Sequence, residues 1–411
     1  PGQYQTDKIV RETIGEWETA WLKFQKGEID GIGIDVSIAS DYKGSAQAYF
    51  TPTDFVSSFQ LQSSEEALKN RESAGINKTI LTYTEFRKAL SLGIDRAAYA
   101  SACTTSSLAG FGLYNTMHYY DVENGGAYRE TDAAKQVLCN VYGIDVSEYD
   151  SLDEAVDAIT GYDLAQARAL IDQAYDKAIA DGKMKEGDKV QLVWGTAVDN
   201  ESQRRNYEFI KDAWTELMVG TKLEGKFELV FDASFGDNWA NDFRSGAYDV
   251  CAGGWTGAAW DPGYFLLAYL SPDYMYSAAW DTSSQQMTFT MPVEQEDGTV
   301  KDTELTMSLM DWYNCLNGIA GSAYDWSANA VSQETRLPLI AALEEQVLLA
   351  YYTLPMFNEY SASLMSFKTD YISYEYNTFM GYGGIRYMTY NYNNGDWADY
   401  VSSKGGQLNY K

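Results

Sequence analysis

The chain has 411 residues, of which 45% are hydrophobic and 22% charged, a composition typical of a folded globular protein with two or three domains. Its 59 acidic and 30 basic residues give a net charge of −29, which argues against nucleic acid as the main partner because no surplus of lysine and arginine can replace phosphate counterions. No apolar stretch reaches the ~20 residues of a membrane-spanning helix, and the single histidine leaves little room for a histidine-rich metal site or a Ser–His–Asp triad.

The first element in the chain is an amphipathic helix over residues 13–26. Its apolar side chains follow the i, i+3, i+4, i+7 spacing of one helix face, at Trp17, Ala20, Trp21 and Phe24. Gly27 supplies a helix stop, and the apolar segment 28–34 predicts a short buried strand. A helix that leads directly into a strand is typical of α/β proteins.

The middle of the chain alternates helices and strands. Thr82 and Glu85 predict a capping box at the start of one helix, and Asp163 with Gln166 opens another. The further predicted elements are strands at 190–194, 227–231 and 248–252 and helices at 201–218 and 239–244. This strand–helix–strand order predicts a largely parallel sheet.

Residues 287–306 interrupt that alternation. Apolar and polar residues alternate on both sides of the Asp297–Gly298 turn, which predicts a β-hairpin excursion. A last long helix is predicted over 332–349, with Pro338 in its early part, followed by an apolar strand at 354–357.

Cysteine and histidine usage indicates no cofactor or metal. Cys103, Cys139, Cys251 and Cys315 form no C-x-x-C pair, so the sequence favours buried thiols over one occasional disulfide. His118 lies between Met117 and Tyr119, a setting that favours a partly buried structural histidine.

Four blocks, at 24–30, 86–96, 246–255 and 343–357, together resemble one family. They are similar, in this order and spacing, to the C-terminal two-thirds of an extracellular solute-binding protein of the oligopeptide/dipeptide ABC-importer class (solute-binding protein family 5). The residues themselves favour structural roles within these blocks. Arg87 and Arg96, near Asp95, are expected to make surface or capping ion pairs.

The resemblance implies a two-lobed α/β fold of the periplasmic-binding-protein type (type II), in which hinged lobes close on a ligand. Residues 1–78 and 364–411 would belong to lobe I, and residues 79–363 would form lobe II. In the family a further segment precedes these residues and completes lobe I. We expect that segment either to be a separate chain or to be missing because this chain is incomplete.

The resemblance also implies a function without catalysis. The protein would capture a small solute, expected to be a peptide, and deliver it to the permease of an ABC transporter. It would lie outside the cell, lipid-anchored in a Gram-positive envelope through an N-terminal segment absent from this chain, and would contact the membrane only through that anchor.

The family's ligand-facing loop follows a strand that ends in Gly-Trp, which corresponds here to residues 253–262. Two adjacent glycines permit close backbone approach, and ligands of open α/β sheets bind beyond the carboxyl ends of strands. The family's commoner W-x-A-D-x-x-D-P pattern places an aspartate that pairs with a peptide amine where this chain has Ala258. The candidate ligand-binding residues are Trp255, Thr256, Gly257, Ala258, Trp260, Asp261, Asn358 and Tyr360.

The alternative roles of these residues stay open. Trp255 suits ligand stacking and a core position equally, and Asp261 suits a turn cap before Pro262 better than a ligand contact. A non-peptide solute such as an oligosaccharide is the alternative ligand, since tyrosine and tryptophan are abundant. A degenerate sensory or scaffold protein is the other alternative, because the amine-pairing carboxylate is missing.

Overall fold

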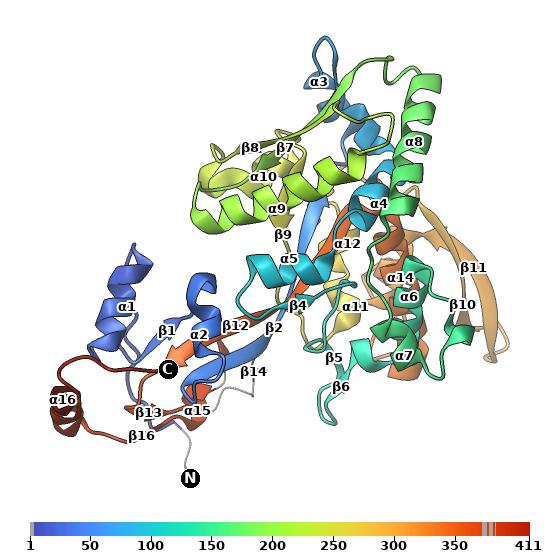
Figure 1. Ribbon diagram of the computed structural model, residues 1–411. Helices are drawn as coiled ribbons and strands as arrows, with labels where there is room; N and C mark the ends of the chain where they lie inside the picture. The colour runs from blue at the N-terminus through green and yellow to red at the C-terminus, as the bar shows by residue number, and fades with distance from the viewer. Residues whose placement is uncertain (1–3, 372–375, 378–380, 383) are drawn as a thin grey trace. The chain divides into compact units, whose positions relative to one another are not determined.

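The chain was analysed as a computed structural model that describes residues 4–371, 376–377, 381–382 and 384–411 (Figure 1). It forms two compact units. Unit 1 comprises Pro1–Thr53, Ala100–Leu108 and Asn358–Lys411, and unit 2 comprises Asp54–Tyr99 and Ala109–Phe357. Residues 54–78, which the sequence assigns to the first lobe, therefore lie in unit 2, and residues 100–108 lie in unit 1.

Unit 1 consists of short elements from both ends of the chain. Its elements are α1 (Trp17–Gln25), β1 (Gly31–Gly33), η1 (Val36–Ile38), α2 (Ala39–Tyr42), β13 (Thr369–Asp370), β14 (Tyr376–Asn377), β15 (Gly381–Tyr382), α15 (Gly384–Tyr387), β16 (Thr389–Tyr390) and α16 (Asn394–Ser403), with parts of β2 (Ala48–Leu61), α5 (Arg96–Cys103) and β12 (Thr353–Met365). Strand β1 pairs antiparallel with the end of β12.

Stacked aromatic rings form the core of unit 1. The ring of Tyr410, near the C-terminus, stacks on Phe24 of α1 at 4.3 Å between centroids and on Phe367 at 4.6 Å. Helix α1 begins four residues later than the sequence predicts, and Phe24 is its buried residue. The C-terminal segment thus covers the apolar face of α1.

Unit 2 contains the remaining elements. They are α3 (Glu65–Asn70), β3 (Ile76–Asn77), η2 (Thr79–Thr82), α4 (Thr84–Leu92), β4 (Leu108–Ala109), β5 (Tyr119–Asp121), β6 (Gly126–Ala127), η3 (Tyr128–Glu130), α6 (Asp132–Tyr142), η4 (Val146–Glu148), α7 (Leu152–Asp157), α8 (Leu164–Ala180), β7 (Lys189–Gly195), α9 (Glu201–Met218), β8 (Phe227–Asp232), η5 (Gly236–Asn238), α10 (Trp239–Arg244), β9 (Val250–Gly253), α11 (Pro262–Phe265), α12 (Leu267–Leu270), β10 (Gln286–Glu294), β11 (Val300–Ser308), α13 (Leu309–Leu316) and α14 (Gln333–Ala350). Strands β4 and β12 and helix α5 extend into both units.

Strand β7 organises the sheet of unit 2. It pairs in parallel with β8 along its length, with β3 at its start and with β9 through Trp194 and Val250. Strand β9 also pairs antiparallel with β2, with Ser58 opposite Gly253. The predicted parallel arrangement is confirmed, and the carboxyl end of β9 leads directly into the candidate loop.

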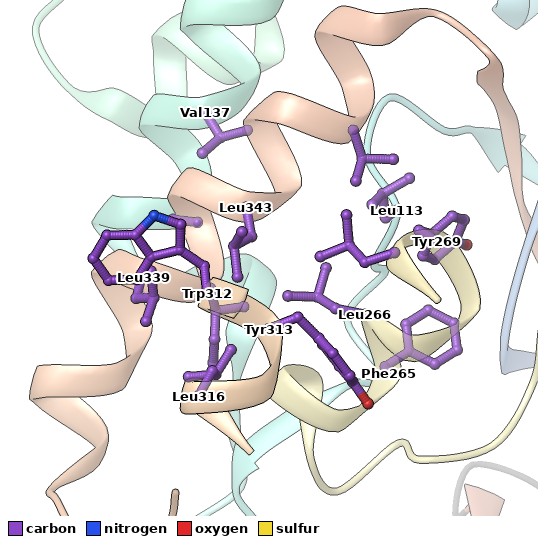
Figure 2. Close-up of a cluster of buried hydrophobic side chains, with 14 of the residues drawn as sticks. Leu113, Val137, Phe265, Leu266, Tyr269, Trp312, Tyr313, Leu316, Leu339 and Leu343 are labelled. Atoms are coloured by element: carbon purple, nitrogen blue, oxygen red, sulfur yellow. The ribbon is translucent and has the colours of Figure 1, made fainter. Parts of the chain in front are cut away.

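Unit 2 also contains a hydrophobic core formed mainly by helices (Figure 2). It gathers buried side chains from α6, α11 to α14 and the segment before β5, among them Leu113, Val137, Phe265, Leu266, Tyr269, Trp312, Tyr313, Leu316, Leu339 and Leu343. The indole Nε1 of Trp312 donates a 2.9 Å hydrogen bond to the carbonyl of Met287 and so ties the hairpin β10–β11 to this core.

Two expectations from the sequence are wrong. The capping box at Thr82 does not form, because α4 begins at Thr84 and the Thr82 hydroxyl instead donates to the carbonyl of Thr79. Arg87 and Arg96 make no ion pair with any residue that the structure describes; they are buried, 3% and 0% exposed, and backbone carbonyls accept their hydrogen bonds. Carbonyl oxygens compensate a buried guanidinium only in part.

The expected buried thiols are confirmed, since all four cysteines are described, buried and not joined in a disulfide. Pro338 lies inside α14, as predicted. Within the described ranges, no helix is both long enough and apolar enough to traverse a bilayer.

Candidate functional site

The candidate loop, residues 254–261, leaves β9 through two closely packed glycines. A Cβ atom on Gly254 would lie 2.4 Å from the carbonyl oxygen of Val56, and one on Gly253 would lie 3.1 Å from the ring of Tyr276. A larger side chain at Gly254 would displace β2 backbone, so the start of the loop is held against that strand.

Trp255 is half-buried and packs on the helical core of unit 2. Its ring lies 5.2 Å from that of Tyr276, with the planes inclined by 44°. The indole Nε1 is buried and has no hydrogen-bond partner among the described residues. Since a buried N–H group normally finds a partner, this indole donor is an exception among the described residues.

Tyr276 contacts both the ring of Trp255 and the backbone of the loop. Its hydroxyl donates to the carbonyl of Gly254 at 3.4 Å, and burial raises the pKa of Tyr276 to about 12. The phenol therefore keeps its proton at neutral pH and acts as a donor.

The next three residues turn the loop. Thr256 is exposed, and Gly257 adopts a φ of +98° with no atom within 4 Å of a Cβ built there. The N–H of Gly257 donates a 2.8 Å hydrogen bond to Oδ2 of Asp54, a side chain only 2% exposed. Ala258 follows at a φ of +50°, in the left-handed region that alanine rarely adopts.

The loop ends at the start of α11. Trp260 is 40% exposed. The carboxylate of Asp261 accepts a hydrogen bond from the N–H of Tyr264 and caps α11, whose first residue is Pro262. Oδ1 of Asp261 also lies 3.3 Å from the guanidinium of Arg336. Asp261 thus has the capping role that the sequence favours, and its charge is shared with Arg336, which is 1% exposed.

His118 precedes Tyr119, whose backbone is hydrogen-bonded to the loop. It is fully buried, its ring lies 4.8 Å from that of Phe265, and its Nδ1 lies 3.1 Å from the amide oxygen of Asn115. Burial lowers the pKa of His118 to about 4 against the opposing field of Asp54, so the ring is neutral at pH 7. The neighbouring N–H of Tyr119 donates to the carbonyl of Ala259 at 2.6 Å. His118 is therefore a structural residue, more deeply buried than the sequence suggests.

The other two candidates lie in unit 1, on β12. The Asn358 side chain is half-buried, and its Oδ1 has no hydrogen-bond partner in the described part of the chain. The N–H of Tyr360 donates to Oγ of Ser107 at 3.2 Å. The six candidate residues within the 254–261 loop thus lie in unit 2, whereas Asn358 and Tyr360 belong to the other unit.

The residues that sequence reasoning missed are Asp54 and Tyr276. A lone acid beside the apolar pair Phe55–Val56 is a weak signal for a buried carboxylate, and nothing marks Tyr276 among 33 tyrosines. Across the described ranges, no group of three or more His, Cys, Asp and Glu side chains could hold a metal ion. The loop itself offers hydrogen-bonding groups, aromatic rings and the carboxylate of Asp261.

Comparison with known families gives one match. The family model for the middle part of the bacterial extracellular solute-binding proteins, family 5, matches residues 1–277, a range that includes the whole candidate loop. Comparison with curated protein sequences gives no match.

Solved structures share the fold at low sequence identity. The pheromone receptor PrgZ, described with its mode of peptide binding, superimposes with a TM-score of 0.58 at 13% identity over 92% of this chain and 57% of its own. Listeria monocytogenes OppA bound to peptide superimposes with a TM-score of 0.57 at 13% identity, over 93% of this chain and 58% of its own. The substrate-binding domain of an oligopeptide ABC transporter from Bacillus anthracis superimposes with a TM-score of 0.59 at 11% identity, over 92% of this chain and 58% of its own. The chain therefore spans somewhat more than half the length of these proteins.

Proposed function

The chain belongs to family 5 of the bacterial extracellular solute-binding proteins, and from this membership we propose that it binds a peptide or peptide-like solute and delivers it unchanged to the permease of an ABC importer. The single observation that carries the proposal is the family match over residues 1–277. The peptide-binding proteins that share the fold support it. Units 1 and 2 are the proposed lobes.

In this proposal the loop contributes donors and aromatic surface. Trp255 Nε1 would donate to a solute carbonyl, which would satisfy the buried N–H group. Trp260, 40% exposed, would contact an apolar part of the solute, and Thr256 would add its exposed hydroxyl. Asn358 and Tyr360 stay candidates from unit 1.

Two aspects of the loop favour a solute without a free α-ammonium at this point. The carboxylate of Asp54 accepts the hydrogen bond of Gly257, and Oδ1 of Asp261 is shared between Tyr264 and Arg336. Ala258 supplies no charge. A buried ammonium without its own counter-charge costs several kcal/mol, so an N-blocked peptide suits this loop better than a peptide with a free amine.

Matched peptides test the proposal. We expect N-acetyl-tetraalanine to raise the melting temperature of the protein more than free tetraalanine does, with both peptides recovered intact by mass spectrometry. Ala258→Asp should reverse that preference, and the left-handed backbone at this position tolerates aspartate better than alanine. Trp260→Ala should weaken peptide binding, whereas Tyr390→Ala, which removes a similarly exposed ring in unit 1, should not.

The alternatives make different predictions for the same assay. Stabilisation by oligosaccharides and not by peptides would replace the peptide with a sugar ligand. No stabilisation by either class would favour a sensory or scaffold protein. Shortened peptides would indicate an enzyme and overturn the proposal. An extracellular location accords with the family, and attachment by a lipid anchor in a Gram-positive envelope is part of the same proposal.

A further inference from the structure

Unit 2 contains a second cleft, separate from the 254–261 loop. Its volume is about 300 Å³, and it lies where α4, the end of α6 and the start of α8 come together. Its polar and aromatic lining includes Lys88, Tyr142, Thr160, Gly161, Asp163 and Gln166. The proposed function uses none of these residues.

Lys88 of α4 is the lysine that lines this cleft. It is half-buried, and its ammonium makes no ion pair or side-chain hydrogen bond with any residue that the structure describes. By contrast, Lys177 on the adjacent helix α8 pairs with Glu85 of α4. A half-buried lysine whose ammonium makes no ion pair can attract an anion from solution.

A second positive charge lies directly behind the cleft wall. Arg96 is fully buried, and its guanidinium donates to the carbonyls of Pro355, Ser91 and Gly161, the last at 2.9 Å. No described carboxylate lies within 4.0 Å of it. A Cβ on Gly161 would lie 2.8 Å from Nη1 of Arg96, so this guanidinium lies next to Gly161, one of the residues that line the cleft.

The same wall contributes free backbone donors. The N–H groups of Thr160 and Gly161 donate no hydrogen bond within the described ranges. The flanking N–H groups are satisfied, because Ile159 donates to the carbonyl of Val156 and Asp163 to that of Leu92. Backbone N–H groups without a protein acceptor and a lysine in the same cleft are the kind of donors that recognise an oxyanion.

We propose that this cleft binds a small carboxylate monoanion between the ammonium of Lys88 and the N–H groups of Thr160 and Gly161. Asp163 also lines the cleft, and its negative charge disfavours a dianion such as hydrogen phosphate. The volume of about 300 Å³ holds an acid of a few carbon atoms and excludes a folded partner.

Titration with acetate tests this proposal on the whole chain. At pH 7 and constant ionic strength, we expect saturable shifts of the Thr160 and Gly161 amide signals in two-dimensional NMR spectra. Lys88→Gln should weaken acetate binding by about tenfold, the scale of one charge-assisted hydrogen bond. Lys88→Arg should retain binding, and Lys69→Gln, which removes an exposed lysine, should leave it unchanged.

Three outcomes would overturn the assignment. The first is the absence of saturable shifts at Thr160 and Gly161, and the second is acetate binding by Lys88→Gln as tight as in the parent chain. The third, tighter binding of inorganic phosphate than of acetate, would reject a carboxylate ligand. A lower melting temperature of Lys88→Gln would mean that its weaker binding could come from misfolding. The acetate titrations of Lys88→Arg and of the parent chain then decide whether the cleft binds a carboxylate.

Discussion

The N–H of Gly257 donates a 2.8 Å hydrogen bond to Oδ2 of Asp54, so an acid in β2 holds the loop that follows β9. The same two strands pair farther along, where Ser58 lies opposite Gly253. The loop is thus attached at its start by strand pairing and at its turn by a buried carboxylate. Its shape depends on contacts between segments about 200 residues apart.

Replacement of Asp54 should therefore destabilise unit 2. Asp54→Ala leaves the N–H of Gly257 without its partner, and we expect the free energy of unfolding in urea to fall by about 1–3 kcal/mol. Asp54→Asn keeps an acceptor oxygen and should lose less. Asp237→Ala, at an exposed acid, should stay within ~0.5 kcal/mol of the parent. Equal stability of Asp54→Ala and the parent would show that the bond is dispensable.

Two tryptophans allow a matched test of the buried indole donor. Trp255→Phe removes an Nε1 that has no partner, so we expect a change in unfolding free energy of less than ~1 kcal/mol. Trp312→Phe removes a 2.9 Å hydrogen bond from a fully buried side chain and should cost ~2–4 kcal/mol. Equilibrium urea denaturation followed by circular dichroism measures both. A larger loss for Trp255→Phe would contradict the assignment of its N–H as unsatisfied.

The glycines of the loop should respond differently to alanine. Gly254→Ala places a Cβ atom 2.4 Å from the carbonyl of Val56, and we expect a melting temperature several degrees lower, equivalent to ~2 kcal/mol or more. Gly257→Ala meets open space and suffers only backbone strain of about 1 kcal/mol at a φ of +98°. Scanning calorimetry compares the melting temperatures of the two variants. A lower melting temperature for Gly257→Ala than for Gly254→Ala would show that the backbone at Val56 moves to accommodate the new Cβ atom.

His118 should make stability depend on pH. Its folded-state pKa of about 4 lies below the ordinary value of 6.5, so the unfolded chain binds more protons between these pH values. The stabilising contribution of the neutral ring is complete above pH 6.5 and is lost as the pH falls toward 4, by roughly 3 kcal/mol in all.

The experiment compares unfolding free energies of the parent and His118→Asn from pH 7 to pH 4. Because His118 is the only histidine in the chain, carboxylates account for the remaining dependence in both proteins. We expect a shallower fall for His118→Asn. Parallel curves would mean that the imidazole titrates alike in the folded and unfolded states.

Local patterns predicted much of the fold. Helix α9 occupies the predicted residues 201–218, where Tyr207, Ile210 and Trp214 lie on one buried face, and α10 occupies the predicted 239–244. The hairpin β10–β11 and the parallel pairing of β7 with β8 were also predictable from alternation and order. The family and its α/β fold class are confirmed.

Other elements carried no local signal. Strand β2, Ala48–Leu61, escaped prediction because it buries threonine, serine, aspartate and glutamine side chains in place of an alternating apolar pattern. The position of the candidate loop after β9 was predictable from the end of a strand. Its support by Asp54 and Tyr276 was not, since both contacts join residues distant in sequence.

The burial of all four thiols has a practical consequence for testing whether a solute changes the distance between units 1 and 2. Maleimide dyes require an accessible thiolate, so the native cysteines form an unreactive background in the folded chain. One cysteine introduced in α16 and another in the β10–β11 hairpin would then take a donor and an acceptor fluorophore. Energy transfer between them would report, molecule by molecule, whether added solute brings the labelled points closer together.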